Sequence, residues 1–309
     1  MAEGAVLAVV GPTAAGKSAA AIQLAERLGG EVVSVDSTMV YRGMDIGTDK
    51  PSPADLARVP HHLVDVVDPS RTMTVAEFQQ AARAAVDSIL SRGRTPVLVG
   101  GSGLYFRAVV DPLEFPGTDP ALRARLEAEG EEAGAAALFA RLRSLDPEAA
   151  ARMEPANVRR TVRALEVIEL TGRPFSSFRT GWDGRRSIYP LTVAALSHPR
   201  DELDRRIDAR VDAQIARGLV AEVQRLVAAG FRASLTSVQA LGYAQVLAHL
   251  DGEVTMEQMV ATIKHRTRRY ARRQLSWFRA DRRVTWFEAD PRGLVAHLAS
   301  AASPHPPGG

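Results

Sequence analysis

The chain has 309 residues, which is more than one compact domain usually needs. Its hydrophobic (46%) and charged (24%) fractions are those of a globular protein, so wholesale disorder and fibrous repeats are excluded. The absence of cysteine excludes a disulfide framework, a thiolate nucleophile, a cysteine-ligated zinc site and an iron–sulfur cluster, and it leads us to expect a cytoplasmic protein.

The first hundred residues alternate between strand-like and helix-like patterns. Val6–Val10 is a continuous apolar run, typical of a strand buried on both faces of a parallel sheet. Lys17–Leu28 has helical apolar spacing and stops at two glycines, and a second helix is expected from a capping box at Thr74 to about Arg92. Further strands are expected at 31–35, 63–67 and 95–99. This alternation predicts an α/β fold with a doubly wound parallel sheet.

The composition changes after about residue 113, where prolines and glycine mark a break. Residues 114–188 are expected to form a helical insertion domain, whose clearest helix spans 156–171. A strand at 189–196 returns to the sheet, helices follow at 201–216, 220–228, 239–250 and 256–278, and a last strand is expected at 285–287. We therefore divide the chain into a first part of the core (1–113), the insertion (114–188), the part that completes the core (189–290) and a partly disordered tail (291–309).

The charge is unevenly distributed. The net charge is only +3, but residues 264–283 contain nine Lys or Arg and one Asp, so this segment carries +8. Such an asymmetry indicates a polyanionic partner. The apolar run at the N-terminus is too short for a signal peptide, and no other stretch approaches the length that crosses a bilayer, so we expect no membrane association.

The strongest motif follows the first strand directly. It is Gly11-Pro12-Thr13-Ala14-Ala15-Gly16-Lys17-Ser18, which fits G-x-x-x-x-G-K-S/T between a buried strand and a helix. Glycines let backbone N–H groups point at phosphate oxygens, Lys17 supplies a full charge, and Ser18 can ligate Mg²⁺. The sequence therefore predicts a site for a diphosphate or triphosphate, as in nucleotide- and ATP-binding P-loop proteins.

The acidic residue that usually ends a second strand of such proteins is absent, because the strand at 95–99 ends in Gly100-Gly101-Ser102-Gly103. An acid follows the strand at 31–35 instead, as Asp36. At the carboxyl end of a parallel strand it would face the crevice beside the phosphate loop. We interpret Asp36 as a base or hydrogen-bond acceptor aimed at a nucleophile, with a turn or helix-capping aspartate as the alternative.

Several short blocks together resemble the tRNA dimethylallyltransferase family, in the right order over roughly residues 5–285. Besides the phosphate loop and Ser34–Ser37, these blocks are Tyr41–Thr48, Lys50-Pro51, His61-His62-Leu63, Gly100–Tyr105, Arg163-Ala164-Leu165-Glu166 and Gly242-Tyr243.

The resemblance implies a P-loop-type core with a helical insertion, Mg²⁺ as cofactor, and two substrates. These are dimethylallyl pyrophosphate, and the tRNA anticodon stem-loop, whose adenosine 3′ of the anticodon receives the dimethylallyl group on N6. It further implies that residues 13–18 hold the pyrophosphate and that Asp36 accepts a proton or hydrogen bond from N6. Ser102 would assist there, and a diphosphate ligand would come from Arg206 or Arg210, between which the sequence does not choose. The tRNA contacts implied are Asp36, Ser37, Thr38, Met39, Ser102, Arg123, Arg159, Arg160, Thr161, Val162, Arg163, Gln239, Gly242 and Tyr243.

The residues are consistent with this chemistry. Lys17, an arginine and Mg²⁺ would stabilise the charge on the leaving pyrophosphate, and an ionised Asp36 would assist a poorly nucleophilic amine. In the last long helix we expect Trp277 and Phe278 to be core residues and the arginines to face RNA. We expect a monomer.

Two other functions compete with this one. A small-molecule P-loop kinase would use ATP and place Asp36 on an acceptor hydroxyl, but it leaves the basic segment and the insertion unexplained. A non-catalytic RNA-binding NTPase leaves Asp36 and Ser102 without a role.

Overall fold

A computed structural model describes residues 4–179, 184–233 and 237–302. The chain forms two compact units, and each is described by itself. The first comprises residues up to Val110 together with those from Tyr189 onward, and the second comprises Asp111–Ile188. The insertion therefore begins at Asp111 rather than at the expected residue 114.

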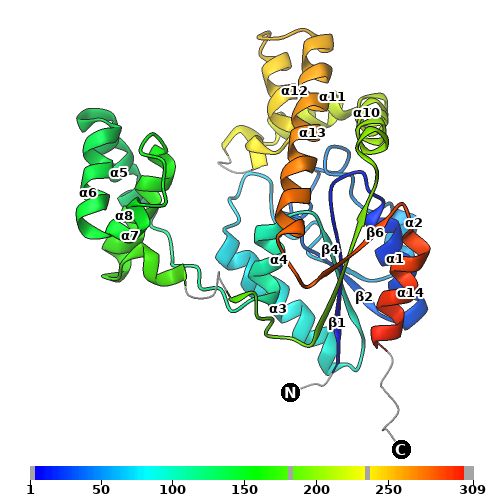
Figure 1. The fold of residues 1–309 in the computed structure, drawn as a ribbon. Coiled ribbons are helices and arrows are strands. Elements are labelled where there is room, and N and C mark those ends of the chain that lie inside the picture. The colour runs from blue at the N-terminus through cyan, green and yellow to red at the C-terminus, as the bar shows by residue number, and fades with distance from the viewer. Residues whose placement is uncertain (1–3, 180–183, 234–236, 303–309) are drawn as a thin grey trace, which may run out of the picture. The chain divides into compact units, whose positions relative to one another are not determined.

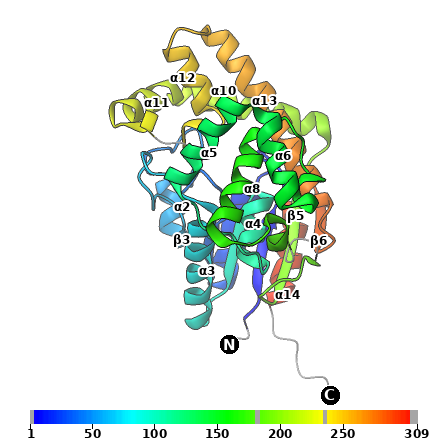
Figure 2. The ribbon, with the colours of Figure 1, turned by 90° about the vertical axis from the view of Figure 1, so that its left-hand side faces the viewer.

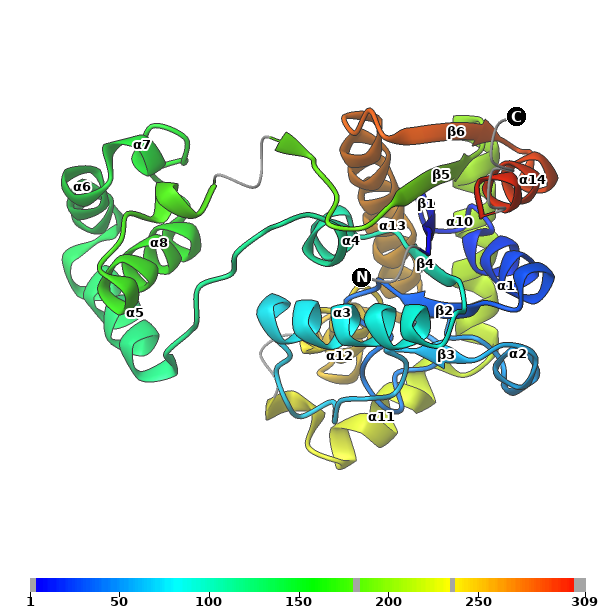
Figure 3. The same ribbon diagram turned by 90° about the horizontal axis from the view of Figure 1, so that it is seen from below.

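The first unit is built on a six-stranded sheet in which every pair of neighbouring strands is parallel (Figure 3). The strands are β1 (Val6–Val10), β2 (Glu31–Ser34), β3 (His61–His62), β4 (Pro96–Gly100), β5 (Leu191–Ser197) and β6 (Val284–Glu288), in the spatial order β3-β2-β4-β1-β5-β6. Val10 pairs with Gly100 on one side and with Ala195 on the other, so the carboxyl ends of the central strands are level. The predicted α/β fold is confirmed.

Helices cover both faces of this sheet (Figures 1 and 3). α1 (Lys17–Leu28) and α14 (Pro291–Ala302) lie on one face, and α3 (Val75–Ser91) and α4 (Gly103–Val110) lie on the other. Side chains alternate along β1, so that Leu7 and Val9 join the core under α1 and α14 while Val6, Ala8 and Val10 join the opposite core. The phosphate loop thus leaves a strand that is buried on both sides.

One helix of this unit was not predicted, and one predicted strand is absent. The tail predicted for 291–309 contains α14, because Leu294, Val295, Leu298 and Ala299 form an apolar stripe that packs against α1 and the sheet; residues 303–309, including Pro304–Gly309, lie outside the described part. The strand predicted for 63–67 is absent, because Leu63 and Asp65 have positive φ angles of 61° and 56°, which no strand accommodates. The paired residues are His61 and His62 instead.

Four helices gather at the carboxyl ends of the strands, as Figures 1 and 2 show from two sides. They are α10 (Arg200–Ala216), α11 (Leu219–Ala228), α12 (Tyr243–Leu250) and α13 (Met256–Arg279). The helix expected over 239–250 is divided into a short 3₁₀ turn, η3 (Ser237–Gln239), and α12. Gly242, with a positive φ of 94°, is the N-cap of α12 and interrupts the helix there. The smaller elements α2 (Pro53–Arg58) and η2 (Phe231–Ala233) complete the unit.

The second unit is helical. It contains α5 (Pro120–Ala133), α6 (Ala135–Leu145), α7 (Pro147–Ala150), α8 (Val158–Thr171) and the 3₁₀ helix η1 (Phe175–Arg179). Leu126, Leu138, Leu142 and Leu165 form the centre of its own small core. None of the helices in the described ranges of either unit is long and apolar enough to cross a membrane.

Candidate active site

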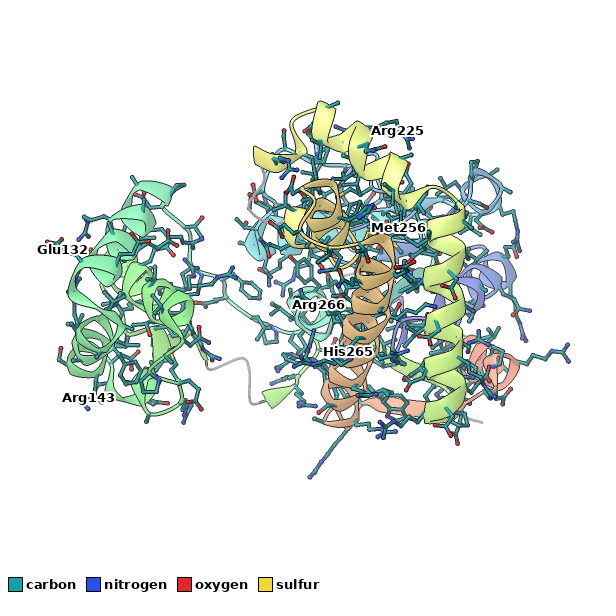
Figure 4. All side chains as sticks on the ribbon, turned by 90° about the horizontal axis from the view of Figure 1, so that it is seen from above. Glu132, Arg143, Arg225, Met256, His265 and Arg266 are labelled. Atoms are coloured by element: carbon teal, nitrogen blue, oxygen red, sulfur yellow. The ribbon has the colours of Figure 1, made fainter. Side chains whose placement is uncertain are left out.

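A cavity of about 550 Å³ opens in the first unit at the carboxyl ends of the strands. Its walls come from the phosphate loop, the segment that follows β2, the glycines after β4, and helices α10 and α13. Figure 4 looks down on this end of the sheet and labels Arg266, which is one of the α13 residues in the wall. In open parallel sheets, ligands bind at the edge formed by the carboxyl ends of the strands.

The phosphate loop has the backbone that its motif predicts. Gly11 and Gly16 have φ angles of 130° and 93°, and a Cβ on Gly11 would lie 2.4 Å from the carbonyl oxygen of Leu196. α1 then begins at Lys17, whose Nζ donates a hydrogen bond of 2.6 Å to the carbonyl of Pro12. The loop therefore curls around the ammonium at a helix N-terminus, the arrangement that binds phosphate.

Lys17 is held in an unusual electrostatic state. Desolvation is the largest cause, and with the nearby charge of Arg210 it lowers the pKa of the ammonium from 10.5 to about 7, while the Asp36 carboxylate opposes the shift. An ammonium with this pKa lacks an anionic partner. A bound diphosphate would supply one.

The structure distinguishes the two candidate arginines of α10. Arg210 lines the cavity and its Nη1 donates to Thr13 Oγ1 at 2.9 Å. Arg206 does not line it; its Nε donates to the carbonyl of Ala14 at 2.9 Å and so braces the loop from outside. Arg210 is therefore the arginine in position to contact a diphosphate.

Asp36 lies in the wall of the cavity, immediately beyond β2. Its Oδ1 accepts hydrogen bonds from the backbone N–H of Thr38 at 2.8 Å and from Thr38 Oγ1 at 2.6 Å. In the described part of the chain nothing donates to Oδ2. The turn fixes the carboxylate and leaves one oxygen for an external donor. The turn alternative and the catalytic interpretation of Asp36 are thus compatible. Ser37, Thr38 and Met39 line the same wall.

A buried carboxylate that sequence reasoning missed holds the neighbouring loop. Glu222, 2% exposed, accepts hydrogen bonds from the N–H groups of Asp45, Ile46 and Gly47 at 3.1, 2.8 and 3.3 Å. It also accepts one from the Tyr243 hydroxyl at 2.6 Å. The sequence signal was the joint presence of the Tyr41–Thr48 and Gly242-Tyr243 blocks.

Tyr243, which the family resemblance places in a tRNA-contacting segment, has its side chain in the core. Its ring is completely buried, and a Cβ on Gly47 would lie 2.4 Å from it, so the two residues form one packed unit. Its neighbours Gln239 and Gly242 line the cavity.

The basic residues of α13 form two stripes, one paired with acids of α10 and the other facing the cavity. Lys264, Arg268 and Arg272, one turn apart, pair with Asp212, Asp208 and Asp204 of α10. The Lys264–Asp212 distance is 2.7 Å and the Arg272–Asp204 distance is 3.5 Å. Arg268 and Arg272, two of the arginines expected to face RNA, thus have acidic partners on α10.

A second stripe of α13 faces the cavity. It consists of Arg266, Arg269, Tyr270 and Arg273. Helical spacing separates it from the paired stripe, so three arginines of α13 face the cavity while Lys264, Arg268 and Arg272 pair with α10.

The remaining aromatic residues of α13 differ from each other. Phe278 is a core residue, as expected, but Trp277 is 42% exposed. The ring of Trp277 covers Gly103, where a Cβ would lie 1.8 Å from it. Ser102, between β4 and α4, is half-buried and is not among the residues of the cavity wall.

The second unit holds the other predicted tRNA residues, and two of them have structural partners. Arg123 and Arg163 donate to the buried carboxylate of Glu166 at 2.6 and 2.7 Å. Thr161 and Val162, also predicted to contact tRNA, are each 1% exposed and belong to the inner face of α8.

Arg159 and Arg160, at the start of α8, are exposed. Their guanidinium groups are available to an external polyanion.

The donors at the phosphate loop fit Mg²⁺. Ser18 lines the cavity and offers a hydroxyl oxygen, and a bound diphosphate would add its own oxygens. Mg²⁺ prefers such hard oxygen ligands, few from protein and several from phosphate and water. No group of three His, Asp or Glu residues in the described ranges forms an all-protein metal site.

His61 and His62 have other partners. His62 Nε2 lies 2.7 Å from Glu31 Oε2, and His61 Nδ1 lies 2.8 Å from the carbonyl of Val59. Burial lowers the pKa of His61, which lines the cavity as a neutral ring near pH 7.

Comparisons with known proteins agree with this geometry. The family model described as IPP transferase matches residues 39–281. A Streptomyces coelicolor protein named tRNA dimethylallyltransferase is 55% identical over 278 residues, which cover 90% of this chain and 88% of that protein.

Two solved structures are also similar. A tRNA isopentenylpyrophosphate transferase from Bacillus halodurans is 42% identical with a TM-score of 0.71 and 97% coverage of both chains. A eukaryotic dimethylallyltransferase described as acting on tRNA has a TM-score of 0.80 at 26% identity, covering 93% of this chain and 74% of that one. The kinase interpretation finds no support among these relatives.

Proposed function

Because this chain belongs to the IPP transferase family, we propose that it transfers a dimethylallyl group from dimethylallyl pyrophosphate to N6 of the adenosine 3′ of the anticodon in tRNA. The observation that carries the proposal is that one cavity holds both a site for the leaving diphosphate and a base for the nucleophile. A cationic phosphate loop forms one wall, and a fixed carboxylate with an unoccupied oxygen forms another.

The phosphate loop would bind the leaving group. As the allylic C–O bond breaks, its electron pair goes to the pyrophosphate, and negative charge grows on the oxygens that face Lys17 and Arg210. Preorganised donors in such a place typically contribute a factor of about 10²–10³ in rate. Mg²⁺, which Ser18 would help to hold, supplies further charge neutralisation when bound.

Asp36 would act on the nucleophile. The exocyclic amine of adenine is weakly nucleophilic because its lone pair is delocalised into the ring. A carboxylate oxygen on its N–H takes the proton as the N–C bond forms, which is usually worth a factor of about 10²–10⁴. The Thr38 bonds to Oδ1 hold the carboxylate in place, and Oδ2 is the oxygen left for the amine.

RNA would reach the site along α13. The stripe of Arg266, Arg269 and Arg273 brings three guanidinium groups to the cavity wall, and Tyr270 adds an aromatic face. An adenosine must leave its stack to enter an enclosed site, which is least costly in a loop. The exposed Arg159 and Arg160 of the second unit would contact the phosphate backbone of the anticodon stem-loop. We also infer that the protein acts as a cytoplasmic monomer.

Mass spectrometry of the nucleosides tests the proposal. Incubation of the protein with unmodified tRNA, Mg²⁺ and dimethylallyl pyrophosphate should add about 68 Da, one C5 unit replacing hydrogen, to an adenosine beside the anticodon. A parallel incubation with ATP tests for phosphoryl transfer. Product formation with ATP, or none with dimethylallyl pyrophosphate, would refute the proposal.

A further inference from the structure

Gln274 connects α13 to the phosphate loop over a sequence separation of 261 residues. Its side chain is 5% exposed, and Oε1 accepts the backbone N–H of Thr13 at 2.9 Å. The hydroxyl of Thr13 also accepts the hydrogen bond from Arg210, and Thr13 lines the cavity. A buried carboxamide is costly unless it is hydrogen-bonded, so this position selects for a side chain that reaches the loop.

The nitrogen end of the same carboxamide is also confined. It lies against the loop after β4, where a Cβ on Gly101 would be 2.1 Å from Nε2. Burial raises the pKa of the Tyr270 phenol, one turn earlier on α13, and the nearby Gln274 side chain opposes this rise. The oxygen of the carboxamide is thus bonded to Thr13, and its nitrogen end has no free space on the side of Gly101.

We propose that Gln274 is a positioning residue for the transfer reaction, holding the phosphate loop in its binding shape by anchoring the Thr13 amide to α13. This inference rests on the proposed function. The glycine at 101 then has a physical reason: it leaves the space that the carboxamide occupies. The glycine-rich block after β4 therefore packs closely against α13: Gly101 leaves space for Gln274, and Gly103 leaves space for Trp277.

The consequence concerns both substrates. α13 carries the arginines that face the cavity, and Gln274 links this helix to the residues that grip the diphosphate. A displacement of about 1 Å in a positioned reactant can cost up to about 10² in rate. Loss of the anchor should therefore weaken diphosphate binding and slow transfer while RNA affinity is kept.

The primary test is Gln274→Met in the full chain, which keeps an unbranched side chain and removes the hydrogen bonds. We expect the Kd for inorganic pyrophosphate, measured by calorimetry with Mg²⁺, to rise at least 10-fold. The KM for dimethylallyl pyrophosphate should rise and kcat should fall, with the KM for tRNA unchanged. A merely destabilising change would lower kcat through the active fraction and leave both KM values alone. Gln224→Met, at an exposed position of α11, is the matched control and should change nothing.

A second pair of variants keeps the inference falsifiable if Gln274→Met folds poorly. Gly101→Ala displaces the carboxamide without altering α13 and should reproduce the loss. In a Gln274→Ala background, where the obstructed side chain is absent and only the 3.1 Å approach to the Gly11 carbonyl remains, adding Gly101→Ala should raise the pyrophosphate Kd less than it does in the wild type.

Three outcomes separate the claims. Pyrophosphate affinity and kcat/KM of Gln274→Met within 2-fold of wild type would overturn the inference. Equal losses from Gly101→Ala in both backgrounds would overturn it too. An inactive wild type would instead refute the proposed function, since pyrophosphate binding is measured without transfer.

Discussion

The depressed pKa of Lys17 predicts that diphosphate binding takes up a proton. In the free protein the ammonium has a pKa of about 7, because it is desolvated and lies near Arg210. A diphosphate in the loop would place several negative charges beside it and restore a pKa well above neutral. At pH 8 a group with pKa 7 is about 90% neutral, so binding should take up about 0.9 proton; at pH 7 the uptake should be about 0.5.

The assay is titration calorimetry of dimethylallyl pyrophosphate in buffers of different ionisation enthalpy. At pH 8 a terminal phosphate with a pKa of about 6 is fully ionised, so uptake reports on the protein. Lys17→Arg carries a charge that does not titrate and should lose the uptake. Any remainder would belong to a group other than Lys17.

Arg210→Met provides a second check on the cause. Removing the like charge raises the pKa of Lys17, so the uptake at pH 8 should fall below the wild-type value. Wild-type uptake below about 0.2 proton at pH 8 would refute the assignment, as would equal uptake in the wild type and Lys17→Arg.

Four further predictions follow from the same contacts. Asp36→Asn should lower the single-turnover transfer rate by about 10²–10⁴ while tRNA and pyrophosphate affinities, measured separately, stay within about 3-fold. Glu222→Ala leaves several buried donors unpaired and should lower the free energy of unfolding in urea by about 2–3 kcal/mol. Leu298→Ala should cost about 2–5 kcal/mol in the same assay, whereas a disordered tail would show no change. Arg269→Gln should reduce the slope of log K for tRNA against log salt by about 1, while Arg272→Gln, whose partner is Asp204, should reduce it less.

The parts of this molecule that could be predicted are those whose conformation depends on consecutive residues. β1, the phosphate loop and α1 follow one another without a gap, and the capping box of Thr74 and Glu77 is present with both of its hydrogen bonds. In these places a local pattern determines a local conformation. Asp36 belongs with them, because a strand end fixes where the next side chain points.

The parts that sequence reasoning missed depend on which helix faces meet. The acids of α10 at 204, 208 and 212 are as regular as the cations of α13, but the sequence does not say that the two stripes face each other. The charge excess of 264–283 therefore overstated the free positive charge at the site. Trp277 was misplaced for the same reason: its helical face could be assigned, but not the glycine beneath it.

The phosphate loop depends both on its local sequence and on contacts with distant helices. Its backbone follows from its own glycines, yet every residue at its tip is tied to the second half of the chain. The ties are Gln274 and Arg210 to Thr13, Arg206 to Ala14, and His198 to Ala15. Each tie comes from the segment that returns after the insertion, so the cradle is complete only when β5, α10 and α13 have docked. A motif that looks autonomous in sequence thus depends on the helices that also carry the arginines for RNA, which couples the formation of the two substrate sites through one folding event.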